Sequence, residues 1–533
     1  MRSAGSFSQR LFAACALMLA VDSHAQVAGL NYVATELPRP EWPQDVQIAD
    51  MDGDGLLDVI VPFWSSDAGR QLHIYLQQAD HRFLAQPSRL VDIRSEIVAV
   101  AMADVRPEPG AELLLFTGAT VFSLSSAVAG YSGNLRRLFD WPLSSAVPDP
   151  QVTRFLSTPV DATGDGYVDL LLPGVEDYGW FTGAADEQFT LSHQFSTINT
   201  DIDDSDLPPP SGRFSTNISF NAQDGLLVDV QLRSGSLFED FLQTGSAEAD
   251  AILDIRNWMP PAVMAPLGSA DSHDLIYLNI GNDIQGQINI LNMNASGSFA
   301  AQPDWQAPVE MLGDFLLMDV NGDGLSDVVR LVEDGNSWTV SFFTNAGGAF
   351  NFAQADQVMR FSGYDLRVAV TPITGGKPQL SISYYTIPVV AAIRDASIVR
   401  SLLLFNHSAS GPALFNNRPD FLLEETFSAT TVRGLSSPIV LDADLDSDGR
   451  IDAIQVTPEG ALVAKRINSS LQFEDQPFWQ YVPTRGIARF RVMDMNNDGR
   501  PDLILDHSNT VTVLVSALPV TALPVTALPV TSL

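Results

Sequence analysis

Short apolar runs, each followed by a polar turn, recur along almost the whole chain. In the first full example, residues 46–49, 57–62 and 71–76 are typical of three strands, and 82–85 continuing to 90–93 of a fourth. No segment sustains the apolar period of about 3.6 residues that marks an amphipathic helix. The pattern therefore predicts an all-β chain built from units of four short strands, with little helix.

The polar stretch between the first two of these strands returns in the same register. It has the form D-x-[DNT]-x-D-G-x-x-D, and intact copies begin at Asp50, Asp161, Asp319, Asp444 and Asp494. Degenerate copies begin at positions 104, 266 and 371, and a weaker one at 221, so the period is roughly 50–60 residues. Four-stranded units repeated at this spacing predict a β-propeller. We expect eight blades if copy 221 belongs to an insertion, nine if it is a blade, and seven if another copy is miscounted.

The two ends of this array complement each other. The last unit has strand-like runs at 489–493, 502–505 and 510–514, but no fourth strand. Residues 30–35, upstream of the first unit, form a strand without a partner of its own. Adding this N-terminal strand to the outer edge of the last blade would close the ring, which is what we expect.

Each intact loop gathers the oxygen ligands that a hard cation requires. Calcium takes about 6–8 oxygens from carboxylates, amides, carbonyls and water. Positions 1, 3, 5 and 9 offer side-chain oxygens, position 7 varies freely and offers its carbonyl, and glycine at position 6 permits a positive φ. The loop is not an EF-hand, because position 12 lacks glutamate and the flanks are strands.

Asp-Gly pairs also form ordinary turns, but five copies in one register favour several structural calcium sites. The predicted ligands are Asp50, Asp52, Asp54, Leu56, Asp58, Asp161, Thr163, Asp165, Tyr167, Asp169, Asp319, Asn321, Asp323, Leu325, Asp327, Asp444, Asp446, Asp448, Arg450, Asp452, Asp494, Asn496, Asp498, Arg500 and Asp502.

With their flanking strands, the segments VQIADMDGDGLLDVIVP and FLLMDVNGDGLSDVVR resemble the FG-GAP/VCBS repeats of integrin-type β-propellers. The resemblance covers most of residues 26–516. It implies calcium in the loop between the first and second strands of a blade, and it assigns ligands to the five intact loops alone. The copies at 104, 221, 266 and 371 depart from the motif and are expected to bind no metal.

The N-terminus has the features of a secretory signal peptide at residues 1–25. Arg2 and Arg10 precede an apolar run at 11–21, and a small-residue cleavage site follows at 23–25. The run is too short to span a bilayer, so we expect an exported protein without a transmembrane segment, in the periplasm, on the cell surface or outside the cell. Cys15, the single cysteine, lies in this run and fits a lipoprotein anchor poorly. Redox and thiolate-metal functions are excluded for the mature chain.

The C-terminal residues 517–533 repeat Ala-Leu-Pro-Val-Thr and are expected to form a disordered tail after the propeller. The whole sequence has 64 acidic and 29 basic residues, for a formal net charge of −35. Nucleic acid and anionic membranes are therefore poor partners, since both require a basic surface.

No common catalytic motif appears, so we assign no catalytic residue and no organic cofactor. Two function classes remain. The first is a secreted or cell-surface binding or adhesion module for an unidentified protein or glycan, and this is favoured. The alternative is an extracellular carbohydrate-active enzyme, such as a polysaccharide lyase, carried on a calcium-binding propeller. The fold alone does not decide between them.

Overall fold

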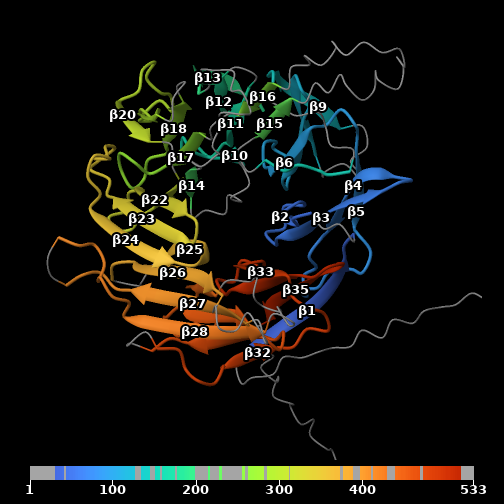
Figure 1. The fold of residues 1–533 in the computed structure, drawn as a ribbon. Helices are drawn as coiled ribbons and strands as arrows, with labels where there is room; N and C mark the ends of the chain where they lie inside the picture. Colours follow the sequence, from blue (N-terminus) through green and yellow to red (C-terminus); the bar gives the residue numbers. More distant parts are fainter. Residues whose placement is uncertain are drawn as a thin grey trace, which may run out of the picture.

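The repeated strand pattern folds as eight four-stranded antiparallel blades in a ring, the arrangement of an eight-bladed β-propeller (Figure 1). The structure is a computed structural model. It describes residues 30–40, 44–125, 134–143, 151–156, 159–174, 177–185, 187–197, 214–216, 227–230, 255–258, 262–280, 285–310, 313–371, 376–387, 397–409, 412–428, 439–468 and 472–517. Every regular element in these ranges is a strand. The predicted fold class is confirmed.

The first four blades follow one another along the chain. Blade 1 contains β2 (Gln47–Ala49), β3 (Asp58–Ser65), β4 (Gly69–Tyr75) and β5 (Arg89–Ile93); blade 2 contains β6 (Ala99–Ala103), β7 (Glu112–Phe116), β8 (Thr120–Leu124) and β9 (Leu135–Asp140). Blade 3 contains β10 (Pro159–Val160), β11 (Asp169–Pro173), β12 (Tyr178–Thr182) and β13 (Thr190–Phe195); blade 4 contains β17 (Ala262–Ala265), β18 (Asp274–Ile280), β19 (Gln285–Leu291) and β20 (Trp305–Glu310).

The remaining blades complete the ring. Blade 5 contains β21 (Asp314–Met318), β22 (Asp327–Asp334), β23 (Ser337–Phe343) and β24 (Gln357–Ser362); blade 6 contains β25 (Tyr364–Thr371), β26 (Gln379–Thr386), β27 (Ser397–Phe405) and β28 (Phe421–Ser428). Blade 7 contains β29 (Val440–Ala443), β30 (Asp452–Val456), β31 (Leu462–Arg466) and β32 (Trp479–Tyr481); blade 8 contains β33 (Arg489–Met493), β34 (Asp502–Asp506), β35 (Thr510–Ala517) and β1 (Asn31–Pro38).

The N-terminal strand closes the ring, as the sequence predicts. Strand β1 pairs antiparallel with β35, in a register that runs from Asn31 opposite Ala517 to Pro38 opposite Thr510. Figure 1 shows β1, from the start of the chain, beside the C-terminal strands of blade 8. The unpartnered edge of β35 and the orphan strand therefore satisfy each other's backbone hydrogen bonds.

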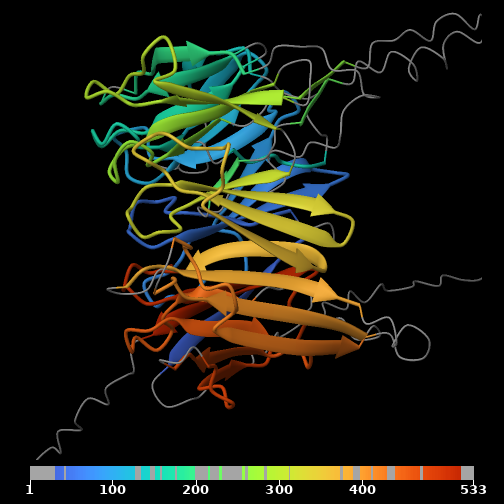
Figure 2. The same ribbon diagram turned by 60° about the vertical axis from the view of Figure 1, so that its left-hand side comes forward.

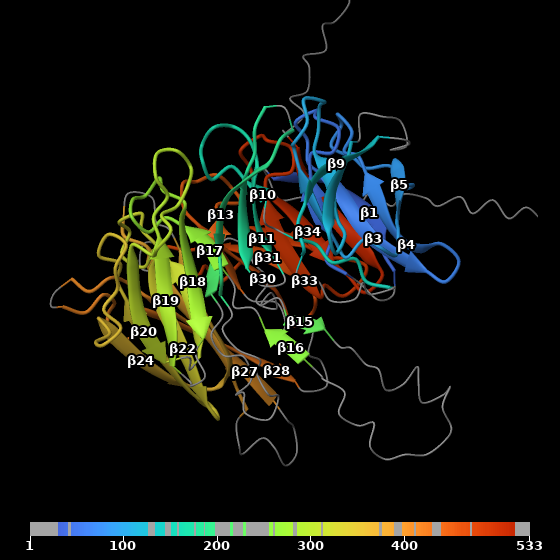
Figure 3. The same cartoon turned by 90° about the horizontal axis from the view of Figure 1, so that it is seen from above.

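The weakest sequence copy, at 221, does not make a ninth blade. Its described part belongs to β15 (Leu227–Val230), which pairs only with β16 (Ile255–Trp258) in a two-stranded sheet. Figure 3 shows this pair apart from the eight blades. A third short strand of the same insertion, β14 (Phe214–Thr216), pairs in parallel with the free edge of β21.

The hydrophobic core is divided among the interfaces between blades. The described residues form eight apolar clusters, and each one joins two neighbouring blades. One of them, for example, joins Ile60 and Leu72 of blade 1 to Val100 and Leu113 of blade 2. Figure 2 shows the successive sheets packed face to face in this way. A blade buries its second face only by contacting the next blade, so the ring folds as a repeat array.

The predicted fourth strand of the first unit is confirmed only in part, because residues 90–93 lie in β5. Residues 82–85 form only an isolated bridge between Phe83 and Gln77, and a second apolar run, 349–352, lies in a turn before the fourth strand of blade 5, β24. Phe83 and Phe350 are nonetheless buried, in two different inter-blade clusters. In these two blades, the aromatic residue in the connection between the third and fourth strands therefore packs into the hydrophobic core between blades. This burial explains why the connection has an apolar sequence like that of a strand.

Residues 1–25, which are predicted to be a signal peptide, lie outside the described residues. Of the predicted tail 517–533, only Ala517 is described, and it is the last residue of β35 rather than part of a tail. Within the part of the chain that the structure describes, no helix is long and apolar enough to cross a membrane.

Candidate metal centres

All five intact loops connect the first strand of a blade to its second strand, as the sequence predicts. Because all eight blades have the same antiparallel order, these connections lie on one face of the ring. The glycine at position 6 has a positive φ in every intact loop, between 78° and 87°. Position 4 also has a positive φ in all five, including Ser447 and Asn497, which the sequence did not suggest. Two residues with a left-handed backbone conformation turn the loop tightly, so that its side-chain oxygens lie on the inside of the turn.

A common hydrogen-bond network shapes the intact loops. In blade 1, Asp50 at position 1 accepts the N–H of Gly53 at 2.7 Å and of Gly55 at 2.9 Å. Asp54 at position 5 accepts the N–H of Leu56 at 2.9 Å. The bonds to position 1 from position 6, and to position 5 from position 7, recur in the other four loops. The loop is therefore pre-shaped by its own carboxylates.

The acid at position 9 has a structural role that the sequence reasoning did not assign. Asp58 is fully buried at the start of β3; its two oxygens accept the N–H of Met51 in the loop and of Gln77 after β4, both at 2.8 Å. Asp169, Asp327 and Asp502 make the same bridge. This carboxylate ties the loop to the end of the third strand whether or not a cation binds.

The residues present fit a hard cation in three loops. In blades 1 and 7, oxygens of the acids at positions 1, 3 and 9 lie within 4.8 Å of one another; these are Asp50, Asp52 and Asp58, and Asp444, Asp446 and Asp452. In blade 7, Asp446 Oδ1 and Asp452 Oδ1 are buried without a hydrogen-bond partner. The hydroxyl of Thr163, at position 3 in blade 3, is also buried and unpartnered. An unsatisfied buried polar atom is costly, and a bound cation would supply each of these oxygens with the partner it lacks.

The loops of blades 5 and 8 use position 3 differently. The side-chain amide of Asn321 donates to Asp323 at 2.9 Å, and that of Asn496 donates to Asp498 at 3.2 Å. In these two loops positions 3 and 5 already contact each other, so a cation would have to replace an internal hydrogen bond.

An arginine contacts the blade 7 loop. Arg466, at the end of β31, donates through Nε to Asp446 Oδ2 at 2.7 Å and lies 3.9 Å from Asp448. Its guanidinium already neutralises part of the negative charge of Asp446, so it would compete with a metal ion for this carboxylate. The loop motif does not predict this contact, because Arg466 lies 20 residues after Asp446 in the sequence.

Burial strongly affects the position 9 acids. It raises the pKa of Asp58, Asp327 and Asp452 to about 7, and that of Asp502 to about 6. Neighbouring loop acids raise these pKa values further, while the backbone N–H bonds lower them. A bound divalent cation would also lower these pKa values, because it favours the charged form of the carboxylate.

The loops also connect neighbouring blades. The position 8 N–H of one loop donates to a backbone carbonyl of the preceding loop: Leu57 to Met495 at 2.8 Å, and Ala111 to Asp50 at 2.8 Å. Ser326 donates to Pro266 in the same way, at 2.7 Å. Position 2 side chains are buried in the inter-blade clusters; they are Met51, Ala162, Val320, Leu445 and Met495. Loop geometry is therefore part of the blade interface.

In the degenerate loop of blade 2, residues 104–112, arginine side chains from the loop and from β9 lie among the acids. Arg106 stands at position 3, with a side chain that is 0% exposed. It donates to the hydroxyl and carbonyl of Ser123 and to the carbonyl of Asn134, at 2.6–3.0 Å. Arg136 pairs with Glu108, at position 5, at 3.2 Å. At position 9, Glu112 still accepts the backbone N–H of loop residues.

The loop of blade 4 has kept only the position 9 acid. Asp274 accepts the N–H of Gly268 at 2.6 Å, the hydroxyl of Ser272 at 2.6 Å and the N–H of Met293 at 2.8 Å. In blade 6 the residue at this place is Gln379, whose amide donates to Asn406 at 3.0 Å. The bridge to the third strand thus persists after the other loop acids are lost.

Comparisons with known proteins do not show a family for this chain. No protein-family model and no curated protein matches the chain. Similar solved structures include a lectin from Agrocybe aegerita that recognises non-reducing terminal N-acetylglucosamine, at 14% identity and a TM-score of 0.34, covering 72% of this chain and 80% of the lectin. Sqt1 from Saccharomyces cerevisiae has 10% identity and a TM-score of 0.29, with coverage of 80% and 96%. The exotype rhamnogalacturonan lyase YesX has 11% identity and a TM-score of 0.30, with coverage of 92% and 75%.

Proposed function

We propose that this chain is an exported, calcium-stabilised β-propeller of the FG-GAP/VCBS type, and that it acts as a binding or adhesion module for a protein or glycan. The observation that carries the proposal is the loop between first and second strands. It occurs five times with the same hydrogen-bond network on one face of the ring.

The calcium part of the proposal is supported by the donor set. The side chains at positions 1, 3, 5 and 9 of the five loops can each offer an oxygen to a metal ion, and oxygens are the preferred ligands of calcium. Asp50, Asp52 and Asp58 would hold the ion in blade 1, and Asp444, Asp446 and Asp452 in blade 7. When bound, the ion supplies positive charge where several carboxylates converge. It would stiffen the blade interfaces, because the same loops form the hydrogen bonds between neighbouring blades.

The binding part is supported by the way the loops are presented. Backbone hydrogen bonds link the loops of blades 8, 1 and 2 to one another, and a rigid scaffold that presents loops is a common basis for recognition. The exported location remains a proposal that rests on the signal peptide in the sequence.

Two measurements test the proposal. Calorimetric titration of the chelated protein with calcium should show binding, with ions counted per chain, and absence of any calcium binding would contradict the calcium part. A glycan array and a panel of extracellular proteins, each probed with and without calcium, should reveal a calcium-dependent partner. Unsaturated sugar products that form in proportion to protein concentration would instead establish the lyase alternative.

A further inference from the structure

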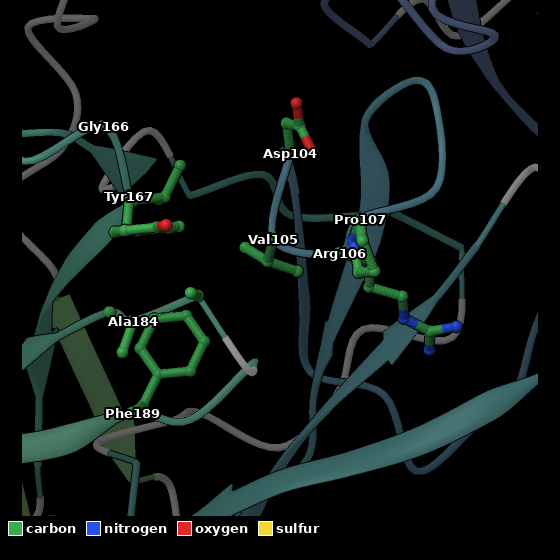
Figure 4. A pocket seen from close by; sticks show the side chains of 11 residues that line it. Asp104, Val105, Arg106, Pro107, Gly166, Tyr167, Ala184 and Phe189 are labelled. Atoms are coloured by element: carbon green, nitrogen blue, oxygen red, sulfur yellow. The ribbon is translucent and has the colours of Figure 1, made fainter.

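A cavity of about 290 Å³ lies between the loops of blades 2 and 3, on the face that carries the candidate metal loops. Asp104, Val105 and Pro107 of the degenerate loop line one side. Tyr167 of the intact blade 3 loop, with Ala184 and Phe189 from the connection between β12 and β13, lines the other side. Figure 4 shows the space between these two groups of side chains. Its volume is close to the lower end of ordinary ligand sites, about 300 Å³.

Asp104 is available to a ligand because of two prolines. In the intact loops of blades 1, 3 and 5, the position 1 carboxylate accepts N–H groups from positions 4 and 6, as Asp50 does from Gly53 and Gly55. The corresponding residues in blade 2 are Pro107 and Pro109, which have no N–H to donate. Among the described residues, no side-chain or backbone hydrogen bond to Asp104 replaces them. The degenerate loop therefore leaves a carboxylate at the edge of the cavity.

The opposite wall is aromatic and apolar. Tyr167 is 41% exposed, so a large part of its ring is open to a ligand. Phe189 is half-buried and is held by Phe139, with ring centroids 5.3 Å apart. Val105, on the side of the degenerate loop, faces these two rings and adds an apolar surface across the cavity (Figure 4). Aromatic faces offer large contact areas to the C–H surface of a flat ring.

The acids at the edge of the cavity disfavour a negatively charged ligand. The guanidinium of Arg106 is directed away from the aromatic wall in Figure 4 and is held by Ser123 and Asn134. Asp104 and the neighbouring loop acid Asp50 are close enough to affect each other. A carboxylate or sulfate on the ligand would be repelled by this pair.

We propose that this cavity binds one uncharged sugar residue, whose apolar face lies on Tyr167 and Phe189 and whose hydroxyls donate to Asp104. This inference rests on the proposed binding function and narrows it to a neutral glycan. Hydroxyl donors to a carboxylate form charge-assisted hydrogen bonds, which are stronger than neutral ones. The contact between the sugar ring and the two aromatic side chains supplies the rest of the binding free energy.

The test is a titration, followed by calorimetry or ligand-observed NMR, with methyl glycosides of neutral hexoses and N-acetylhexosamines. Glucuronic acid and glucosamine serve as anionic and cationic probes. We expect at least one neutral glycoside to bind the wild-type protein. Asp104→Ala should weaken binding about tenfold or more, and Tyr167→Ala should weaken it as well. Asp67→Ala, in the exposed turn between β3 and β4, is the matched control and should bind like the wild type.

The possible results separate this inference from the broader function. Equal binding by wild type, Asp104→Ala and Tyr167→Ala would overturn the cavity assignment while leaving a glycan-binding function intact. Binding of glucosamine or glucuronic acid alone would overturn the neutral-sugar assignment. Failure of all glycosides to bind the wild type would overturn the inference, and the array of glycans and proteins would then decide the broader function independently. Tyr167→Ala gives a second readout should Asp104→Ala fail to fold.

Discussion

The loops of blades 1 and 2 contact each other, yet they balance their acidic groups in different ways. In blade 1, Asp50, Asp52 and Asp58 converge, and the loop offers no positive group of its own at positions 1 to 9. In blade 2, position 3 is the buried Arg106, and the acid at position 5 pairs with Arg136. The two loops keep the same place in the blade, and in both of them the position 9 carboxylate accepts N–H groups of the loop backbone.

This difference shows which part of the loop is needed for the fold and which part is available for a cation. The position 9 carboxylate bridges to the loop backbone in both blades, through Asp58 and Glu112. Positions 1, 3 and 5 can change once their charge is balanced by arginine. We therefore infer that calcium stabilises the intact blades without defining the propeller.

The largest expected effect of this difference is a loss of stability on chelation. Extracellular calcium modules bind with a Kd of about 10⁻⁴–10⁻³ M, so 1 mM calcium contributes at most about 1.4 kcal/mol per site and about 7 kcal/mol for five sites. We expect chelator to lower the melting temperature by on the order of 5 °C in a chain of this size. A thermal melt in calcium and in chelator measures it, and coincident curves would contradict structural calcium.

The next largest effect should come from Arg106→Met in blade 2. The substitution removes hydrogen bonds to Ser123 and Asn134 and leaves nearby carboxylates without their buried partner. We expect a loss of about 3 kcal/mol. The loss should be the same with calcium and with chelator, as measured by denaturant unfolding. The control is Arg137→Met, which breaks an exposed pair with Asp140 and should cost less than about 1 kcal/mol.

A smaller and calcium-dependent effect is expected for Asp52→Ala in blade 1. Asp52 occupies the position that Arg106 occupies in blade 2, but it is a candidate ligand. The variant should lose one bound ion and about 1.4 kcal/mol in 1 mM calcium, and it should lose almost nothing in chelator. Ion counting by equilibrium dialysis, combined with unfolding in both conditions, measures this. A loss of stability that is equal in both would show that Asp52 acts on the fold rather than on a cation.

A further expected effect concerns the pH dependence of stability. Burial raises the folded-state pKa of Asp58, Asp327 and Asp452 to about 7, whereas an unfolded aspartate has a pKa of about 3.9. These groups hold protons more tightly in the folded state, so their contribution to stability is full below about pH 4 and is lost as pH rises through about 7. The chelated protein should therefore be more stable at pH 5.5 than at pH 7.5.

Calcium should reverse that pH trend, because it binds the charged carboxylates. Unfolding midpoints at the two pH values, with and without calcium, measure both trends. A chelated protein that becomes more stable from pH 5.5 to pH 7.5 would show that the position 9 acids are charged in the metal-free fold.

Most of the fold could be predicted from the regular spacing of the repeated loop motif. The recurrence of Asp50-type loops fixed the blade spacing, and the orphan strand now seen as β1 fixed the closure. Local apolar runs predicted individual strands less reliably. Phe83 and Phe350 lie in turns, but their side chains are buried in the core between blades, so the sequence around them resembles that of a strand.

The candidate site was only partly predictable. The five loops follow from spacing, but the bridge from Asp58 depends on Gln77, which lies beyond the next strand. A signal was present in the sequence, since Asp274 persists in a loop that has lost the acids at positions 1, 3 and 5, and Glu112 persists in a loop that has lost the acid at position 3. The contact of Arg466 with Asp446 and the cavity beside Asp104 depend on neighbouring strands and blades, which no local motif specifies.

The most direct test of the difference between intact and degenerate loops is to locate bound ions by anomalous diffraction from crystals grown in calcium. The account predicts calcium in the intact loops, with the loops of blades 1, 3 and 7 filled most completely because their oxygens converge or lack partners. It predicts no ion in the loop of blade 2, where Arg106 and Arg136 balance the acids. Ions in the blade 2 loop, or intact loops without ions at millimolar calcium, would contradict it.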